Sequence, residues 1–201
     1  MSKTFTFQGR KYRYFPSGSD RTIEVPIAAE AARRHSAKGN KILEVGRVLP
    51  RYYKFNETVV DKFEGPIKED ILTWKPPHKF NLIISISTVE HIWWDELKSY
   101  KRWGGSIPRT PGKAAEAIHR MLTFLALGGE MLCTWPMAHN PPLDAALFAG
   151  EFPTAHVAYM RRTTHKTNQW TMSNEAEARV AKMWKPFPAG NVTAIVRWWR
   201  T

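Results

Sequence analysis

Three short apolar runs in the first half of the chain each end in an acidic, glycine or hydroxyl residue. They span residues 41–46 (KILEVG), 58–61 (TVVD) and 80–87 (FNLIISIS). Buried strands of a parallel sheet have this pattern, and their carboxyl ends together line a ligand crevice. The pattern therefore predicts a parallel sheet with a site for a nucleotide-like cofactor at its carboxyl edge.

Helical patterns alternate with such runs along the rest of the chain. One alanine-rich segment begins at Pro26, which suits a first helical turn, and meets basic residues before Gly39. Another carries apolar residues at helical spacing and ends at Gly128 and Gly129, which turn the chain into a strand. The expected elements are helices at 26–35, 113–127 and 174–183, and strands at 131–137, 156–164 and 192–199.

The order of these runs, with EDI at 69–71 and LGGEML at 127–132, resembles that of class I S-adenosylmethionine-dependent methyltransferases. The resemblance covers residues 41–137. It implies an α/β fold: a Rossmann-like, doubly wound, mostly parallel seven-stranded sheet with a C-terminal antiparallel hairpin. It also implies S-adenosylmethionine as the cofactor.

The same resemblance assigns roles to single residues. Glu44 and Gly46 belong to an acidic-x-Gly element that turns under the methionine part of the cofactor. Asp61 would hold the ribose hydroxyls, and Asp70 would lie near the adenine with Ile71 packed on the ring. Each acid also has a structural interpretation, because Asp61 could end a strand in a turn and Asp70 could cap a surface turn.

Small methyltransferase-like proteins share further runs with this chain, namely EVGxVL, VVDK and STxEH. By this resemblance Val45, Lys62 and Ser87 also belong to the cofactor site. The glycine-rich loop of the larger family is missing, because Arg47 and the segment VLP follow Gly46. The departure predicts a different loop path, a shifted ligand or a lost site.

Two charged residues beside this loop have alternative roles. Arg47 could pair with the carboxylate of the cofactor, a bidentate match suited to guanidinium, or point to solvent. Glu44 could orient loop amides or the ammonium group of the cofactor, or form an ion pair with Arg47.

The acceptor side is expected where the run STVEH follows the strand at 80–87. His91 titrates near neutrality and is the candidate general base, with Glu90 to orient or charge it; alternatively, His91 bonds only the backbone. Trp93 and Trp94 could line the acceptor site or cover the adenine, or they could belong to the hydrophobic core. His139 could close this side.

Tyr12, Tyr14 and Arg21 could add a lid to the acceptor side. The seven histidines and one cysteine show no spacing such as HExxH or CxxC, so no metal is expected.

A length of 201 residues with 43% hydrophobic residues suits one domain. We expect residues 1–201 to form a single methyltransferase-like domain, with an N-terminal segment at 1–38, a cofactor-binding core at 41–137 and an acceptor side at 138–201. Cys133 lies in an apolar run and is expected to be a buried thiol. Residues 1–15 lack the apolar core of a signal peptide, so a cytoplasmic protein is expected.

The formal net charge of +12 and the pI of about 10.0 make nucleic acid a possible partner. The basic residues are dispersed, which favours a solvated surface over nucleic-acid binding. Because the chain also has little room for an added recognition domain, we favour methyl transfer to a small or sugar-linked acceptor. An RNA methyltransferase and a non-catalytic methyltransferase-like binding module are the alternatives. A nicotinamide-dependent oxidoreductase is disfavoured, because no GxGxxG follows the first strand.

Overall fold

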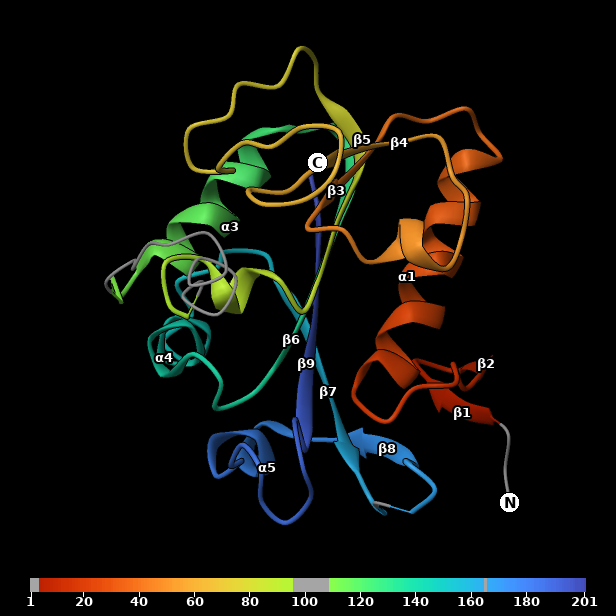
Figure 1. Cartoon of the computed structure of the whole chain (residues 1–201), viewed down its shortest axis with the longest axis vertical. Coiled ribbons are helices and arrows are strands. Elements are labelled where there is room, and N and C mark those ends of the chain that lie inside the picture. Colours follow the sequence, from red (N-terminus) through yellow and green to blue (C-terminus); the bar gives the residue numbers. More distant parts are fainter. Residues whose placement is uncertain (1–3, 96–108, 165) are drawn as a thin grey trace.

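The structure is a computed structural model that describes residues 4–95, 109–164 and 166–201. A small two-stranded sheet precedes a seven-stranded sheet that runs through the middle of the molecule (Figure 1). Across the large sheet the strands lie in the order β4 (Glu57–Val60), β3 (Ile42–Val45), β5 (Phe80–Ile86), β6 (Leu125–Pro136), β9 (Val192–Trp199), β7 (His156–Arg162) and β8 (Trp170–Ser173).

The strand directions are those of a Rossmann-like, doubly wound α/β sheet. Strands β4, β3, β5 and β6 are mutually parallel, and β9 lies antiparallel between β6 and β7. Strand β7 therefore points the same way as β6, and β8 pairs antiparallel with it at the edge. Strands β3 and β5 are buried almost throughout, as expected for central strands of a parallel sheet. The predicted fold class is confirmed.

The closing strands β7 and β9 pair antiparallel as predicted, but β8 and α5 lie between them in the chain. Strands β7 and β9 are antiparallel, with His156 opposite Arg197, but β9 is an inner strand and does not form an edge hairpin. The edge is β8, which the sequence pattern did not predict. The helix expected at 174–183 is the short α5 (Glu175–Arg179), capped where the Asn174 side chain accepts the backbone N–H of Glu177.

Helices cover the two faces of the sheet, and each face has its own apolar cluster (Figure 1). Successive side chains of a strand point to opposite faces, so Ile84 of β5 packs in the cluster with Ile27 and Ile83 packs with Ile118. Cys133 of β6 is buried, as predicted. One face carries α1 (Arg21–Ser36), and the other carries α3 (Lys113–Thr123), α4 (Pro141–Phe148) and α5.

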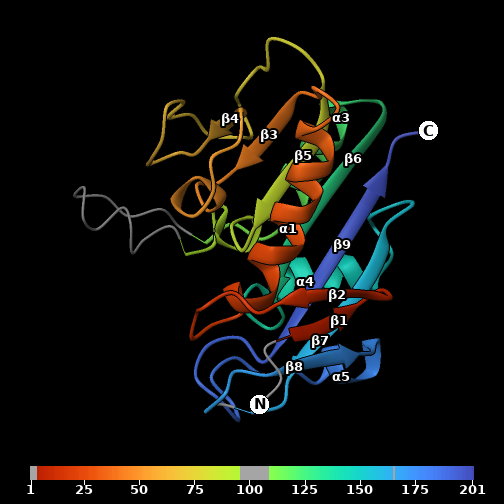
Figure 2. The same cartoon turned by 90° about the vertical axis from the view of Figure 1, so that its right-hand side faces the viewer.

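The N-terminal segment forms a hairpin that the sequence pattern did not predict. Strands β1 (Thr4–Phe7) and β2 (Arg10–Arg13) are joined by a two-residue turn at Gln8 and Gly9, both with positive φ. Side chains on one side of the hairpin, including Phe7, are buried in the cluster under α1. Figure 2 shows the hairpin beside the lower end of α1, near β7 and β8.

Two helix ends differ from the expected ones. Helix α1 begins at Arg21 and contains Pro26, which was expected at its start. A proline inside a helix leaves the carbonyl four residues earlier without its usual donor, and here the Thr22 carbonyl accepts the backbone N–H of Phe15 instead. The helix expected to reach residue 127 ends at Thr123, because β6 already begins at Leu125, opposite Phe80.

The segment between β4 and β5 has no strand among its described residues. Ile67 forms an isolated bridge with Val60, and residues 68–79 contain turns. Within the described ranges, no helix has the length and apolar character needed to cross a membrane.

Candidate active site

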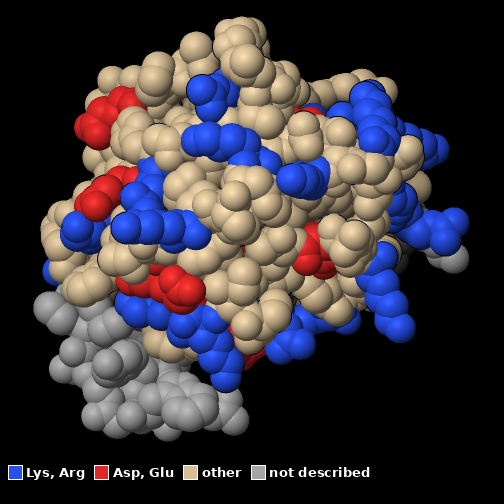
Figure 3. Space-filling model, turned by 90° about the horizontal axis from the view of Figure 1, so that it is seen from above, with Lys and Arg blue, Asp and Glu red and all other residues tan. Residues whose placement is uncertain are grey.

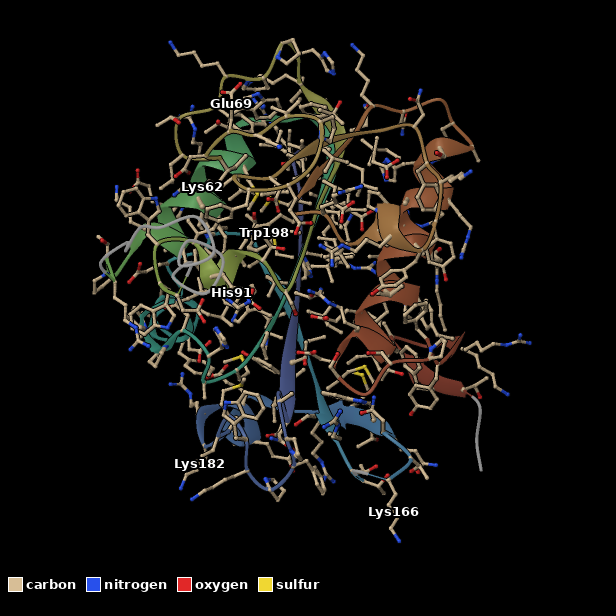
Figure 4. All side chains as sticks on the ribbon, in the orientation of Figure 1. Lys62, Glu69, His91, Lys166, Lys182 and Trp198 are labelled. Atoms are coloured by element: carbon tan, nitrogen blue, oxygen red, sulfur yellow. The ribbon has the colours of Figure 1, made fainter. Side chains whose placement is uncertain are left out.

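A cavity of about 410 Å³ opens at the carboxyl ends of β3, β4 and β5. This is where ligands bind in open parallel sheets, and the volume falls in the roughly 300–1,000 Å³ range of small-molecule pockets. Figure 4 shows Lys62 and His91, which follow β4 and β5, on the same side of the strands. The predicted site residues that line the cavity are Val45, Gly46, Arg47, Asp61, Lys62, Asp70, Ile71, Ser87 and His91.

Gly46 makes the sharp turn at the end of β3. Its φ is +90°, and its amide donates to the Val60 carbonyl at 2.9 Å. A Cβ at this position would lie 2.2 Å from Thr88 Oγ1, so the turn needs both the conformational freedom and the small size of glycine. The chain then enters a short 3₁₀ helix, Leu49–Arg51, in place of a glycine-rich loop.

Arg47 and Leu49, which occupy the loop in place of glycines, take different positions. Arg47 is exposed and lines the cavity. Leu49 is buried in the cluster under α1. The chain after Gly46 thus passes through a 3₁₀ helix in place of a glycine-rich loop, and a cavity still forms beside it.

Glu44 stabilises this turn through hydrogen bonds to the loop backbone and does not line the cavity. Its Oε1 accepts the backbone N–H groups of Val48 and Leu49, both at 2.8 Å. Burial raises the pKa of Glu44 to about 7, although these two hydrogen bonds partly oppose the shift. Of the roles considered from the sequence, the contacts match the orientation of loop amides.

Asp61 stands where β4 ends. Its Oδ1 accepts the backbone N–H groups of Phe63 and Glu64 at 2.8 and 2.7 Å. Its Oδ2 has no hydrogen-bond partner in the described part of the chain, and the residue lines the cavity. One oxygen therefore fixes the turn, as the structural interpretation predicted, and the other remains available to a ligand.

Asp70 is engaged by the protein at both oxygens. Oδ1 accepts the backbone N–H of Leu72 at 2.9 Å, and Oδ2 lies 3.0 Å from both Trp93 Nε1 and Lys62 Nζ. Burial raises the pKa of Asp70, but the Leu72 amide and Lys62 outweigh it and lower the pKa. Lys62 also lies over the Trp93 ring, with its Nζ 4.7 Å from the centroid. The contacts are those of a turn cap and an ion pair, while buried Ile71 lines the cavity.

A buried acid that the sequence did not indicate supports the end of β5. Glu24 of α1 is fully buried, and its Oε1 accepts the Ser87 hydroxyl at 2.7 Å. Arg21 donates to the Ile86 carbonyl at 2.7 Å and lies 3.6 Å from Glu24 Oε2. Arg21 lines the cavity, so one of the three residues proposed for a lid reaches it. Burial raises the pKa of Glu24 to about 8.

The other two proposed lid residues lie elsewhere. Tyr12 is buried against Phe5 in the N-terminal hairpin, and the Tyr14 hydroxyl bonds to the backbone of Trp170. Neither lines the cavity. Both rings pack in or against the apolar cluster under α1.

Two histidines and an aspartate come together at the side of the cavity where the sequence predicts the acceptor. His91 Nδ1 lies 2.5 Å from Asp95 Oδ1, and His139 Nε2 lies 3.0 Å from Asp95 Oδ2. The two rings are in edge contact, with centroids 4.6 Å apart, and all three residues line the cavity. The parallel neighbours β5 and β6 end side by side, which brings the segments that follow them together. The spacing of Asp95 four residues after His91 was the available sequence signal for this pair.

Glu90 lies behind this cluster and does not line the cavity. It is fully buried, and neither carboxylate oxygen has a hydrogen-bond partner among the described residues. Its Oε1 is 3.7 Å from His91 Nε2. The Asn140 side chain donates to the Glu90 backbone carbonyl at 2.9 Å and so joins the two segments.

The negative charges of Glu90 and Asp95 favour the protonated form of His91 at neutral pH. Burial lowers the pKa of His91, but the negative charges of Glu90 and Asp95 outweigh it and raise the pKa to about 9. Burial raises the pKa of Asp95, but the hydrogen bonds from His139 and His91 outweigh it and hold this pKa well below its usual range. Burial also raises the pKa of Glu90.

Comparison with known proteins finds no matching protein-family model and no matching curated protein. Two solved structures to which the chain is similar contain S-adenosylhomocysteine. The N-methyltransferase NodS from Bradyrhizobium japonicum has 14% identity over 90% of this chain and 91% of its own, with a TM-score of 0.45. The 1,6-didemethyltoxoflavin-N1-methyltransferase from Burkholderia thailandensis has 10% identity over 100% of both chains, with a TM-score of 0.47. Similarity at this level does not assign a substrate, and the fold assignment depends on the strand order and directions described above.

Proposed function

We propose that the protein binds S-adenosylmethionine in this cavity and transfers its methyl group to a small or sugar-linked acceptor. One observation carries the proposal: the Gly46 turn and Asp61, whose Oδ2 has no hydrogen-bond partner among the described residues, line one cavity at the carboxyl ends of adjacent parallel strands. A carboxylate in that place can accept a hydrogen bond from a ribose hydroxyl.

The residues around the cavity fit the parts of an adenosyl ligand. Asp61 would accept from the ribose, and Ile71 offers an apolar surface to the adenine. The exposed Arg47 at the loop could pair with a carboxylate. Both oxygens of Asp70 already have protein partners, but Oδ1 accepts only the Leu72 amide, so its second lone pair could still accept from the adenine amino group.

When bound, S-adenosylmethionine supplies a methyl group carried on a positively charged sulfur. The residues of this chain must hold the acceptor in line with that methyl group and exclude water. The cluster at His91 lies on the acceptor side of the cavity. An imidazole with a pKa of about 9 is protonated at neutral pH, so His91 accepts a proton only after losing its own. Its role as general base stays a prediction.

Isothermal titration with S-adenosylhomocysteine tests the binding site. This ligand has a neutral sulfur, so the change in affinity does not include attraction between a sulfonium and the carboxylates. In Asp61→Asn the amide oxygen still accepts from the turn, while an amide NH₂ replaces the second oxygen. Loss of a charge-assisted hydrogen bond of about 1.5–3 kcal/mol predicts an affinity about 10- to 100-fold lower.

Glu64→Gln is the matched control for this titration. Glu64 also lines the cavity, but its carboxylate is half exposed and pairs with Arg51 at 2.6 Å. Its substitution is expected to change the affinity less than about threefold, because exposed ion pairs contribute little. Equal losses in the two variants contradict the ribose role of Asp61.

Binding measurements on the same purified protein distinguish two alternative functions. The charge of +12 favours an RNA methyltransferase, whose RNA affinity should fall steeply with salt. On the face seen in Figure 3, however, the Lys and Arg side chains lie in several groups interrupted by Asp and Glu. A non-catalytic module predicts no heat with either S-adenosylmethionine or S-adenosylhomocysteine.

A further inference from the structure

We infer that His91, Asp95 and His139 form a binding site for a divalent first-row metal cation at the acceptor side of the cavity. The inference depends on the geometry of this cluster, which we call the HDH cluster, and does not require that the cavity binds S-adenosylmethionine. It departs from the sequence-based expectation of no metal, which considered only spacing along the chain.

The donor set suits such a cation. Two imidazole nitrogens and a carboxylate are ligands that zinc, cobalt and iron accept, and three protein ligands with open positions are typical of sites that also bind a water or a substrate. One ligand atom from each residue can be chosen so that all lie within 4.8 Å of one another. Ligand atoms around a metal with bonds of about 2.0–2.2 Å lie about 3–3.5 Å apart, so small side-chain shifts admit the cation.

The surroundings of His91 provide an independent observation. A histidine that binds a metal through one ring nitrogen almost always has a carboxylate or carbonyl beside the other nitrogen. In this chain Nδ1 faces Asp95, and Nε2 faces Glu90 at 3.7 Å. Glu90 is fully buried, and neither of its carboxylate oxygens has a hydrogen-bond partner among the described residues, a costly arrangement that positive charge on or beside His91 relieves.

The site is also accessible and anchored. All three members of the HDH cluster line the cavity, so a cation can enter and an acceptor with oxygen or nitrogen donors can complete its coordination. Trp94 Nε1 donates to the His139 backbone carbonyl at 2.9 Å. The indole of Trp94 therefore reports on this segment, and metal binding is expected to change tryptophan fluorescence.

Cobalt(II) is the probe for the site, because its visible absorption bands depend on its ligands and coordination number. The titration is carried out at mildly alkaline pH, where fewer protons compete for His91. Wild-type protein is expected to bind one equivalent and develop saturable bands that zinc(II) abolishes. Asp95→Asn and His139→Gln are each expected to weaken cobalt binding about tenfold or more.

His119→Gln is the matched control, because His119 is an exposed histidine of α3 outside the cavity. Its cobalt spectrum and affinity should equal those of wild type. Circular dichroism confirms that each variant is folded, and the wild-type titration decides the question even if one variant is not. Absence of saturable bands in wild type, or bands that persist in both folded HDH variants, overturns the inference. Neither result affects the proposed binding of S-adenosylhomocysteine.

Discussion

Replacing Glu44 by glutamine tests how the turn after β3 is held. Its side chain is buried, Oε1 accepts the amides of Val48 and Leu49, and Oε2 has no hydrogen-bond partner in the described part of the chain. Glutamine keeps an accepting oxygen for the two amides and has no charge. The substitution therefore isolates the cost of burying the carboxylate.

The sign of the pH dependence follows from the raised pKa. Burial, partly opposed by the two amides, brings the pKa of Glu44 from 4.5 to about 7. The folded chain binds this proton more tightly than the unfolded chain. The resulting stabilisation is present below pH 4.5 and is lost as the pH rises through about 7. A difference of about 2.5 in pKa corresponds to about 3 kcal/mol in all, of which about 2.5 kcal/mol is lost between about pH 5 and about pH 8.

Urea unfolding followed by tryptophan fluorescence measures this difference. The free energy of unfolding of the wild type, minus that of Glu44→Gln, should fall by about 2.5 kcal/mol between about pH 5 and about pH 8. In the control Glu64→Gln, which removes a half-exposed carboxylate, the corresponding difference should change by less than about 1 kcal/mol. The same difference for Glu44→Gln at both pH values refutes the reasoning.

Two further substitutions test the packing around the site and the lower end of the sheet. Gly46→Ala should destabilise the chain by about 1–3 kcal/mol more than Gly65→Ala, because both have positive φ but only Gly46 would place a Cβ against Thr88; equal midpoints in urea contradict the predicted clash. Arg162→Met should lower the free energy of unfolding by about 2–4 kcal/mol, because the buried guanidinium donates to three separate segments. Arg161→Met removes a half-exposed ion pair and should lower it by less than about 1 kcal/mol in the same assay. Similar losses for the two arginines contradict that role.

Much of the sheet could be predicted because its central strands are buried on both faces. The run at 80–87 became β5, whose Ile83 and Ile84 serve the two opposite clusters, and continuous apolar runs of this kind mark parallel strands. The strands of the N-terminal hairpin and β8 are half-exposed, so their apolar residues do not form continuous runs. The sequence pattern placed the start of this helix at Pro26, whereas α1 begins at Arg21. The proline is tolerated inside the helix because the Thr22 carbonyl accepts the backbone N–H of Phe15, a contact that the pattern could not show.

The residues that line the cavity were predictable where they lie at strand ends, and less so where they are brought together by contacts across the fold. Gly46 and Asp61 follow directly from their places after apolar runs. The sequence could not show that Asp70 would meet Trp93, or that His139 would reach Asp95. The first contact joins the segments that follow β4 and β5, and the second requires β5 and β6 to lie side by side. Spacing along the chain carries no signal for such pairs.

A crystal structure of the protein with S-adenosylhomocysteine tests the central claim most directly. The account predicts one ligand in the cavity, with a ribose hydroxyl at hydrogen-bond distance from Asp61 Oδ2 and the sulfur directed towards the side of His91. A ligand bound elsewhere, or a cavity filled by Arg47 with Asp61 turned away, contradicts it.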